Sequence, residues 1–270
     1  MASGRTSKLR RGTACYVYGV LPASVNLDLR KFVPMGTSPM KCLRGGKLQA
    51  LVDVVSREEF NDAEIQARDL RWIAEKVQHH NRIAQLAAAT AAFVPFRFCT
   101  VLKDEASILK LLASNEQVFL TAFAKLEGKS EWGVRITCNG NKRDAVQGKT
   151  HTQEGQSGKA YLLRKQRELR ATEQTEQRMR SYAETCHREL EELASAVNRL
   201  PGDNYGSASG ARSIFSASYL IVDSETPAFR QRVARLAGEY SPLGINLHLT
   251  GPWPAYSFTD LELSPTRISA

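Results

Sequence analysis

The sequence predicts an α+β protein of two domains: an N-terminal ferredoxin-like sheet with helices on one face, and a C-terminal α+β domain with a long helix. Three observations predict this class. Strand and helix patterns in the first half follow the order β-β-α-β-α-β. A polar segment rich in Gly, Lys and Gln then occupies residues 139–158. A long helical pattern and further strands follow it.

In the first half, short runs of β-branched and aromatic residues predict strands, and apolar residues at steps of three and four predict helices. Arg44–Gly46 indicates a turn between the first two strands. The predicted elements are strands at Ala14–Val20, Leu48–Val55, Phe93–Leu102 and Glu131–Cys138, a helix from about Asp69 to Thr90, and a helix from the N-cap Asp104 to Gly128.

The second half begins with a helical pattern from about Gly158 to Leu200, which Pro201-Gly202 ends. Its second part carries a regular apolar seam, whereas Lys165, Thr172 and Glu176 interrupt the same seam in its first part. We expect that first part to be solvated on most sides or to await a partner. The remaining predicted elements are a strand at Ser213–Asp223, a helix from Pro227 to Tyr240 and a strand at Gly244–Thr250.

Composition is ordinary for a globular chain: 270 residues, 42% hydrophobic and 24% charged, with a formal net charge of +9. No apolar run reaches the roughly 18 residues that a bilayer crossing needs, and no apolar core of a signal peptide follows the basic N-terminus. We therefore expect a cytoplasmic protein. The predicted division is a disordered basic tail at 1–13, domains at 14–138 and 139–259, and a tail at 260–270.

The search for catalytic chemistry finds no motif. The five cysteines include no CxxC pair, so buried free thiols are the favoured interpretation. No histidine stands at metal-ligand spacing, because the adjacent His79 and His80 point about 100° apart on a helix. Phosphate-binding glycine loops and nucleophile elbows are also absent. We expect no enzyme, cofactor or metal site; a cryptic enzyme stays an alternative that would require a deep pocket with a desolvated ionisable group.

The basic stretch Lys142–Arg170 raises a second alternative, a nucleic-acid-binding regulator. Eight basic residues stand there against three acidic ones, and they could bind phosphates in a salt-dependent manner. Only Tyr161 could offer an aromatic platform for a base, so the stretch does not support stacking readout. A solvated basic face is the favoured interpretation.

Several segments, in one order along the chain, resemble the GvpL/GvpF family of gas vesicle proteins. The closing ten residues, Leu249–Phe258 (LTGPWPAYSF), carry the resemblance most specifically. The accompanying segments are Tyr16–Gly19 (YVYG), His80-Asn81, Pro95–Phe98 (PFRF) with Thr100, Lys129–Val134 (KSEWGV) and Gly158–Leu162 (GKAYL). The sequence departs from the family pattern at Cys99, where glycine is expected, and at Ala255, where a second proline is common.

The resemblance implies two α+β domains, the first a modified ferredoxin-like one, and no catalytic residues. It also implies a structural or assembly role in gas vesicles, which are protein-walled, gas-filled compartments of prokaryotes. The implied partners are the small hydrophobic shell protein GvpA and other gas vesicle proteins, and the implied location is the gas vesicle in the cytoplasm.

The aromatic and proline residues of the closing segment are the candidate contact site for a partner: Trp253, Pro254, Tyr256 and Phe258. The favoured interpretation is nevertheless that this segment packs on its own domain as a clasp, because large aromatic residues usually lie in a core. On that interpretation Trp253→Ala mainly destabilises the fold.

Overall fold

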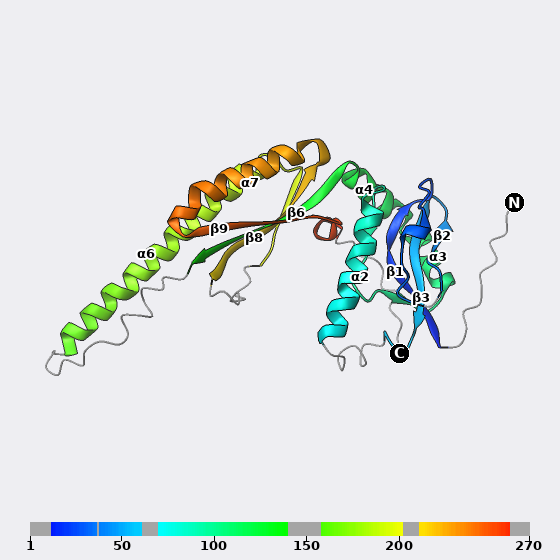
Figure 1. The fold of residues 1–270 in the computed structure, drawn as a ribbon, viewed down its shortest axis with the longest axis horizontal. Helices are drawn as coiled ribbons and strands as arrows, with labels where there is room; N and C mark the ends of the chain where they lie inside the picture. The colour runs from blue at the N-terminus through cyan, green and yellow to red at the C-terminus, as the bar shows by residue number, and fades with distance from the viewer. Residues whose placement is uncertain (1–11, 37, 61–69, 140–157, 202–210, 260–270) are drawn as a thin grey trace. The chain divides into compact units, whose positions relative to one another are not determined.

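The computed structural model describes residues 12–36, 38–60, 70–139, 158–201 and 211–259. The chain forms two compact units (Figure 1). Unit 1 comprises residues 1–131 together with 252–270, and unit 2 comprises residues 132–251. Each unit holds one antiparallel sheet and helices, so the predicted α+β class is confirmed. The predicted tails and linker lie almost entirely outside the described residues.

The sheet of unit 1 has the strand order β2-β3-β1-β4, and β5 also pairs with β1. The strands are β1 (Thr13–Pro22), β2 (Lys41–Gly45), β3 (Leu48–Ser56), β4 (Val94–Pro95) and β5 (Val101–Leu102). The predicted turn at Arg44–Gly46 joins β2 to β3, and Gly46 adopts a φ of 61° there. Sequence patterns did not predict β2, whose five residues are too few to show an alternation.

The structure divides the predicted strand Phe93–Leu102 into two short strands. After β4 the chain leaves the ladder, because Cys99 adopts a left-handed backbone with a φ of 64°. Backbone bonds hold the excursion in place: Phe96 N donates to Tyr18 O at 2.9 Å, and Val17 N donates to Thr100 O at 2.9 Å. A glycine, which the resemblance led us to expect at position 99, would occupy this conformation without strain.

This geometry gives a stability prediction for position 99. Cys99→Gly should be at least as stable as the wild type, whereas Cys99→Val should lose about 2 kcal/mol, because a β-branched side chain is strained at positive φ. Urea denaturation of the three proteins checks the order. Equal stability of the glycine and valine variants would show that the loop does not hold this backbone in solution.

The helices of unit 1 are α2 (Leu70–Ala88), α3 (Glu105–Ser114) and α4 (Glu116–Leu126), with a short 3-10 turn, η1, at Leu29–Lys31. Asp104 is the N-cap that the sequence predicts: Ser107 N donates to its carboxylate at 2.8 Å. The single helix expected from there to Gly128 is two helices. They divide at Asn115, whose side-chain amide donates to Leu111 O at 2.9 Å.

The sequence predicts these helices on one face of the sheet, but α2 and α3 lie against opposite faces (Figure 1). The hydroxyl of Tyr16 bonds His80 on α2. Its neighbour in β1, Cys15, lies near Glu105 of α3. Successive residues of a strand point to opposite faces, so one face receives α2 and the other α3.

Unit 2 has the strand order β7-β8-β6-β9. Its elements are β6 (Lys129–Asn139), α6 (Gly158–Glu191), β7 (Ala196–Arg199), β8 (Ala211–Val222), η2 (Asp223–Glu225), α7 (Thr226–Tyr240), η3 (Ser241–Leu243) and β9 (Ile245–Trp253). The strands β6 and β9 begin in one unit and end in the other. The core lies between the sheet and the two helices and includes Trp132, Cys186, Tyr219, Phe229 and Leu236.

The structure corrects the end of the long helix, which stops at Glu191 and not near Leu200. The next residues cross to the sheet, where β7 pairs with Ala217–Leu220 of β8. Leu193 and Val197 continue the helical spacing and still pack on the core. A four-residue strand therefore fits the same apolar spacing as one more helical turn.

Among the described helices, none combines the length and the apolar character that crossing a bilayer requires.

Candidate partner-contact site

Residues from most of the segments that carry the family resemblance meet in unit 1, although the chain separates them by up to about 240 residues; Gly158–Leu162 begins α6 in unit 2 instead. We call their contact residues the motif cluster: Tyr16, His80, Asn81, Phe96, Glu131, Tyr256 and Ser257. Five parts of the chain contribute to the motif cluster: the strand β1, the helix α2, the loop after β4, the start of β6 and the closing turn η4 (Tyr256–Phe258).

His80 lies at the centre of the motif cluster and is 1% exposed. Its Nε2 lies 3.1 Å from the carbonyl oxygen of Phe96, which can only accept, so this nitrogen carries the proton. Its Nδ1 then accepts from the Tyr16 hydroxyl at 2.8 Å, and that hydroxyl oxygen accepts from Cys99 N at 3.1 Å. Burial lowers the pKa of His80 to about 4, so the ring is neutral at pH 7.

The closing segment attaches to the same cluster. The Tyr256 hydroxyl donates to the Asn81 side-chain oxygen at 3.2 Å, and its ring centroid lies 6.2 Å from that of His80. The buried carboxylate of Glu131 accepts from Ser257 N at 2.9 Å and from the Ser257 hydroxyl at 2.6 Å. Burial raises the pKa of Tyr256, with the Glu131 charge adding to the effect. The segment is therefore fixed to unit 1 by charge-assisted and neutral hydrogen bonds.

The four predicted contact residues differ in their exposure. Pro254 is buried, and Tyr256 and Phe258 are half-buried. The Phe258 ring lies under the Lys125 ammonium at 5.6 Å. Trp253 remains 36% exposed. The structure thus places three of these residues largely in the packing of unit 1 and leaves Trp253 as the one with the most surface for a partner.

Gly19 explains another part of the resemblance. A Cβ atom at this position would lie 2.3 Å from the Val94 carbonyl oxygen and 2.4 Å from the Phe93 ring. Only glycine allows β4 to approach β1 so closely. The glycine of the opening motif therefore serves the placement of the loop that holds Phe96.

Unit 2 holds a second pair of a helix histidine and a strand tyrosine. His187 of α6 is 1% exposed, and its Nδ1 lies 2.7 Å from the Tyr219 hydroxyl of β8. Here Arg199 Nε donates to Nε2 at 3.2 Å, so the proton lies on Nδ1, opposite to His80. Burial lowers the pKa of His187, and the Arg199 charge adds to this effect. Both pairs connect a helix to its sheet.

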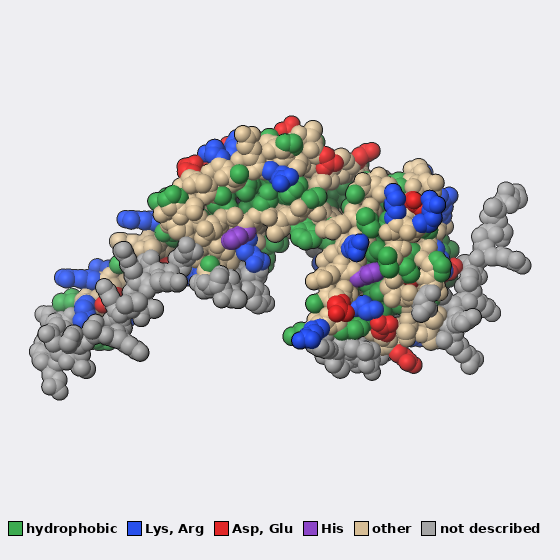
Figure 2. Space-filling view, viewed as in Figure 1, with side chains coloured by type: hydrophobic (Ala, Val, Ile, Leu, Met, Phe, Trp, Pro, Cys, Tyr) green, Lys and Arg blue, Asp and Glu red, His purple; other side chains and the backbone are tan. Residues whose placement is uncertain are grey.

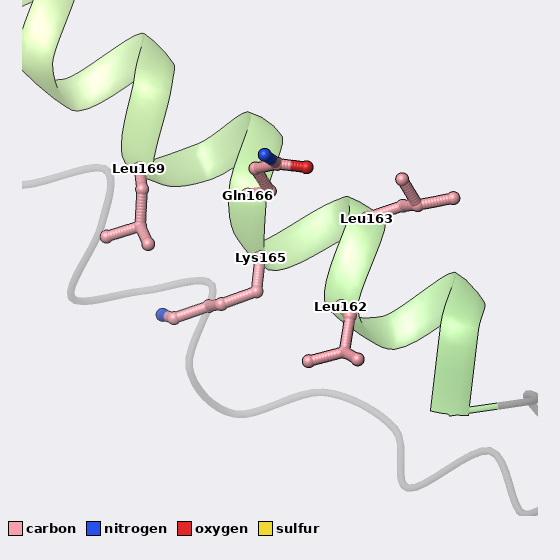
Figure 3. Close-up of a pocket in the computed structure, with 5 residues that line it drawn as sticks. All are labelled: Leu162, Leu163, Lys165, Gln166 and Leu169. Atoms are coloured by element: carbon pink, nitrogen blue, oxygen red, sulfur yellow. The ribbon is translucent and has the colours of Figure 1, made fainter.

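The remaining cysteine and histidine side chains were candidates in the search for catalytic chemistry. The described residues contain no group of three or more His, Cys, Asp or Glu side chains that could hold a metal ion. Burial raises the pKa of the Cys15 and Cys186 thiols to about 11, which keeps them protonated and poor nucleophiles. His79 bonds the Val33 carbonyl, and His151 lies outside the described residues. A shallow depression on α6 is lined mainly by leucines (Figure 3).

The fold and the motif cluster together define a two-unit α+β protein in which the motif residues pack against and hydrogen-bond one another. The family model described as gas vesicle synthesis protein GvpL/GvpF matches residues 14–260. The chain belongs to the GvpL/GvpF family, and the resemblance read from the sequence is confirmed.

Relatives and solved structures agree with this membership. The chain is 28% identical to gas vesicle protein L and 24% identical to gas vesicle protein F of Streptomyces sp. (strain CB03234). These matches cover 90% and 91% of this chain, and 89% and 99% of the relatives. Crystal structures of GvpF from Anabaena sp. PCC7120 and Microcystis aeruginosa share the fold, with TM-scores of 0.66 and 0.63 at 17% identity. Each match covers 92% of this chain, and 97% and 99% of the two GvpF chains.

Proposed function

We propose that this protein acts in gas vesicle formation as a structural or assembly protein that contacts the hydrophobic shell protein GvpA, and that it works without catalysis at the gas vesicle in the cytoplasm. The observation that carries the proposal is the family match over residues 14–260.

The physical case for a shell contact is that a hydrophobic subunit needs a soluble partner with adaptable apolar surface before it assembles. In unit 1 the exposed part of Trp253 lies next to the buried Pro254 and Ala255. An aromatic side chain on a rigid backbone loses little conformational entropy on binding. This supports Trp253 as the contact point within the closing segment.

The nucleic-acid alternative gains no support from the family or from the relatives. Residues 142–157 of the basic stretch lie outside the described residues. Within its described part, the Tyr161 ring lies 5.8 Å from the Arg164 guanidinium.

A direct binding experiment tests the proposal. Purified chain is passed over immobilised GvpA, with an unrelated protein of similar net charge as the control for non-specific attraction. We expect this chain to be retained well above the control. We also expect the retention to persist at 0.5 M salt, where the Debye length falls to roughly 4 to 5 Å and attraction between exposed charges is weak. Retention no greater than the control would remove the proposed GvpA contact.

Two substitutions separate the contact role of the closing segment from its packing role. Tyr256→Ala should lower the free energy of unfolding by about 2 to 4 kcal/mol, because it removes a packed ring and the bond to Asn81. Trp253→Ala should cost no more stability than Tyr256→Ala, about 2 kcal/mol, because about a third of the residue is exposed, and it should weaken retention on GvpA. Thermal denaturation and the binding assay are run together. A large stability loss for Trp253→Ala would instead favour the original interpretation of this residue as a clasp.

A further inference from the structure

A second surface of the protein lies on α6, away from the motif cluster. From Tyr161 to Thr175 every side chain of this helix is exposed, and contact with the core of unit 2 begins near Met179. Figure 1 shows this half of α6 extending beyond the strands of its unit. An isolated helix as short as Tyr161–Thr175 is only marginally stable in water. A helical segment that projects without packing therefore gains stability from a partner.

The projecting half carries large apolar side chains that water would not favour. Leu162 is 67% exposed, Leu169 is 55% exposed and Leu163 is 46% exposed. Leu162, Lys165 and Leu169 point to the same side of the helix, whereas Leu163 points elsewhere (Figure 3). The spacing of seven residues between Leu162 and Leu169 is that of a helix-pairing stripe.

This leucine stripe does not continue the buried seam of the same helix. At 3.6 residues per turn, Leu162 and Leu169 lie roughly 90° around the helix from Met179, Cys186 and Leu190. Extending the seam toward the N-terminus reaches Lys165 and Thr172, which are polar. The buried face of α6 is thus centred roughly 90° from the stripe, although its edge, at Ala183 and His187, turns toward the stripe's direction. The stripe lies N-terminal to the part of α6 that packs on unit 2, where every side chain is exposed, and is suited to another occupant.

The charges beside the stripe indicate what that occupant is. Tyr161–Arg170 contains four basic residues and one acidic residue, Glu168, which leaves a formal charge of +3. Figure 2 shows basic side chains along this part of the helix. By helical geometry Lys165 flanks the stripe on one side and Arg170 on the other. Two copies paired through this stripe would bring like charges together, which opposes self-association.

We propose that the leucine stripe of α6 docks an amphipathic helix of a partner protein whose apolar face is flanked by Asp and Glu. Leucines fill the interface, and the flanking Lys165 and Arg170 select acidic flanks on the partner. The proposal adds a second contact surface to the proposed function and rests on it for the role of the complex. Its test uses no GvpA, so either proposal can fail without the other.

The probe is a synthetic amphipathic peptide of about three heptads with Leu at a and d and Glu at e and g, compared with the same peptide carrying Lys at e and g. Fluorescence anisotropy with the full chain should give an affinity for the acidic peptide at least about tenfold higher than for the basic one, decreasing with salt. Equal binding of both peptides, or no binding of the acidic one, would overturn the proposal.

Three variants locate the binding. Leu162→Glu combined with Leu169→Glu should weaken acidic-peptide binding about tenfold or more, while helix content persists because Glu is a good helix former. Lys165→Glu combined with Arg170→Glu should reverse the preference toward the basic peptide. The matched control is Leu243→Glu in η3, a leucine of comparable exposure at 47%, which should leave both affinities unchanged. Binding that survives the double leucine change would contradict the assignment.

Two other occupants of the leucine stripe would each give a different experimental result. A concentration-dependent dimer in sedimentation velocity that the double leucine change abolishes would assign the stripe to a second copy of this chain. Acidic-peptide binding that appears only after residues 140–157 are replaced by a Gly/Ser linker of equal length would assign the stripe to the chain's own preceding segment. Either outcome contradicts docking of an external acidic helix.

Discussion

Replacing His80 by alanine is expected to lower the free energy of unfolding by about 3 to 5 kcal/mol, among the largest effects of any single change in unit 1. The imidazole is 1% exposed and packs against Tyr16, Tyr18, Phe98 and Tyr256. Its removal leaves a cavity, and it also removes the partners of the Tyr16 hydroxyl and the Phe96 carbonyl. Buried polar groups without partners cost about 1 to 3 kcal/mol each.

The adjacent residue supplies the control for this substitution. His79 is on the same helix, and its Nε2 bonds the Val33 carbonyl at 2.9 Å near the surface. His79→Ala should therefore cost no more than about 1 kcal/mol. Urea denaturation followed by circular dichroism measures both variants. Similar losses for the two would mean that the motif cluster contributes no more than a surface contact.

Acid should destabilise the protein through the same histidine. Burial holds the pKa of folded His80 at about 4, against about 6.5 in an unfolded chain. Between these values the unfolded state binds a proton that the folded state does not, so stability rises with pH. The contribution is fully present above about pH 6.5 and is lost as the pH falls toward 4; a difference of about 2.5 units corresponds to about 3 kcal/mol.

A non-titrating variant isolates this contribution. His80→Gln keeps an amide in place of the ring, and its stability should depend less on pH than that of the wild type between pH 7 and 4. Other groups also titrate: burial lowers the pKa of His187 and raises that of Asp53, but both proteins contain these residues. The difference between the two pH profiles therefore belongs to His80. Parallel profiles would show that His80 protonates equally well in the folded state.

Local pattern determined the class of the fold and most of its elements. The strand β1 and the helix α2 were predicted within a few residues, because β1 is a run rich in β-branched and aromatic residues and α2 carries an apolar periodicity over several turns. The apolar pattern did not predict the elements that are short. The five residues of β2, the four of β7 and the break at Asn115 are too brief for a periodicity to distinguish strand, helix and turn.

Sequence patterns predicted only part of the candidate site. The motif residues were recognised one segment at a time, and the Glu131 and His80 positions appeared as family markers without a role. The sequence signal for these two residues was that each lies within a family motif. Sequence alone could not show that the Glu131 carboxylate binds Ser257, since hydrogen bonds between residues 126 positions apart depend on how the chain folds back.

The sequence by itself determined that this is an α+β chain of the GvpL/GvpF family with a long, partly unpacked helix, because periodicity and short motifs are local properties. The tertiary structure alone decided where the closing segment belongs. Residues 252–259 belong to unit 1, where Asn81 and Glu131 hold the closing turn, although the strand β9 that leads into it lies mostly in unit 2. The physical reason is that buried side chains find their partners by proximity in the folded chain and not by order along it.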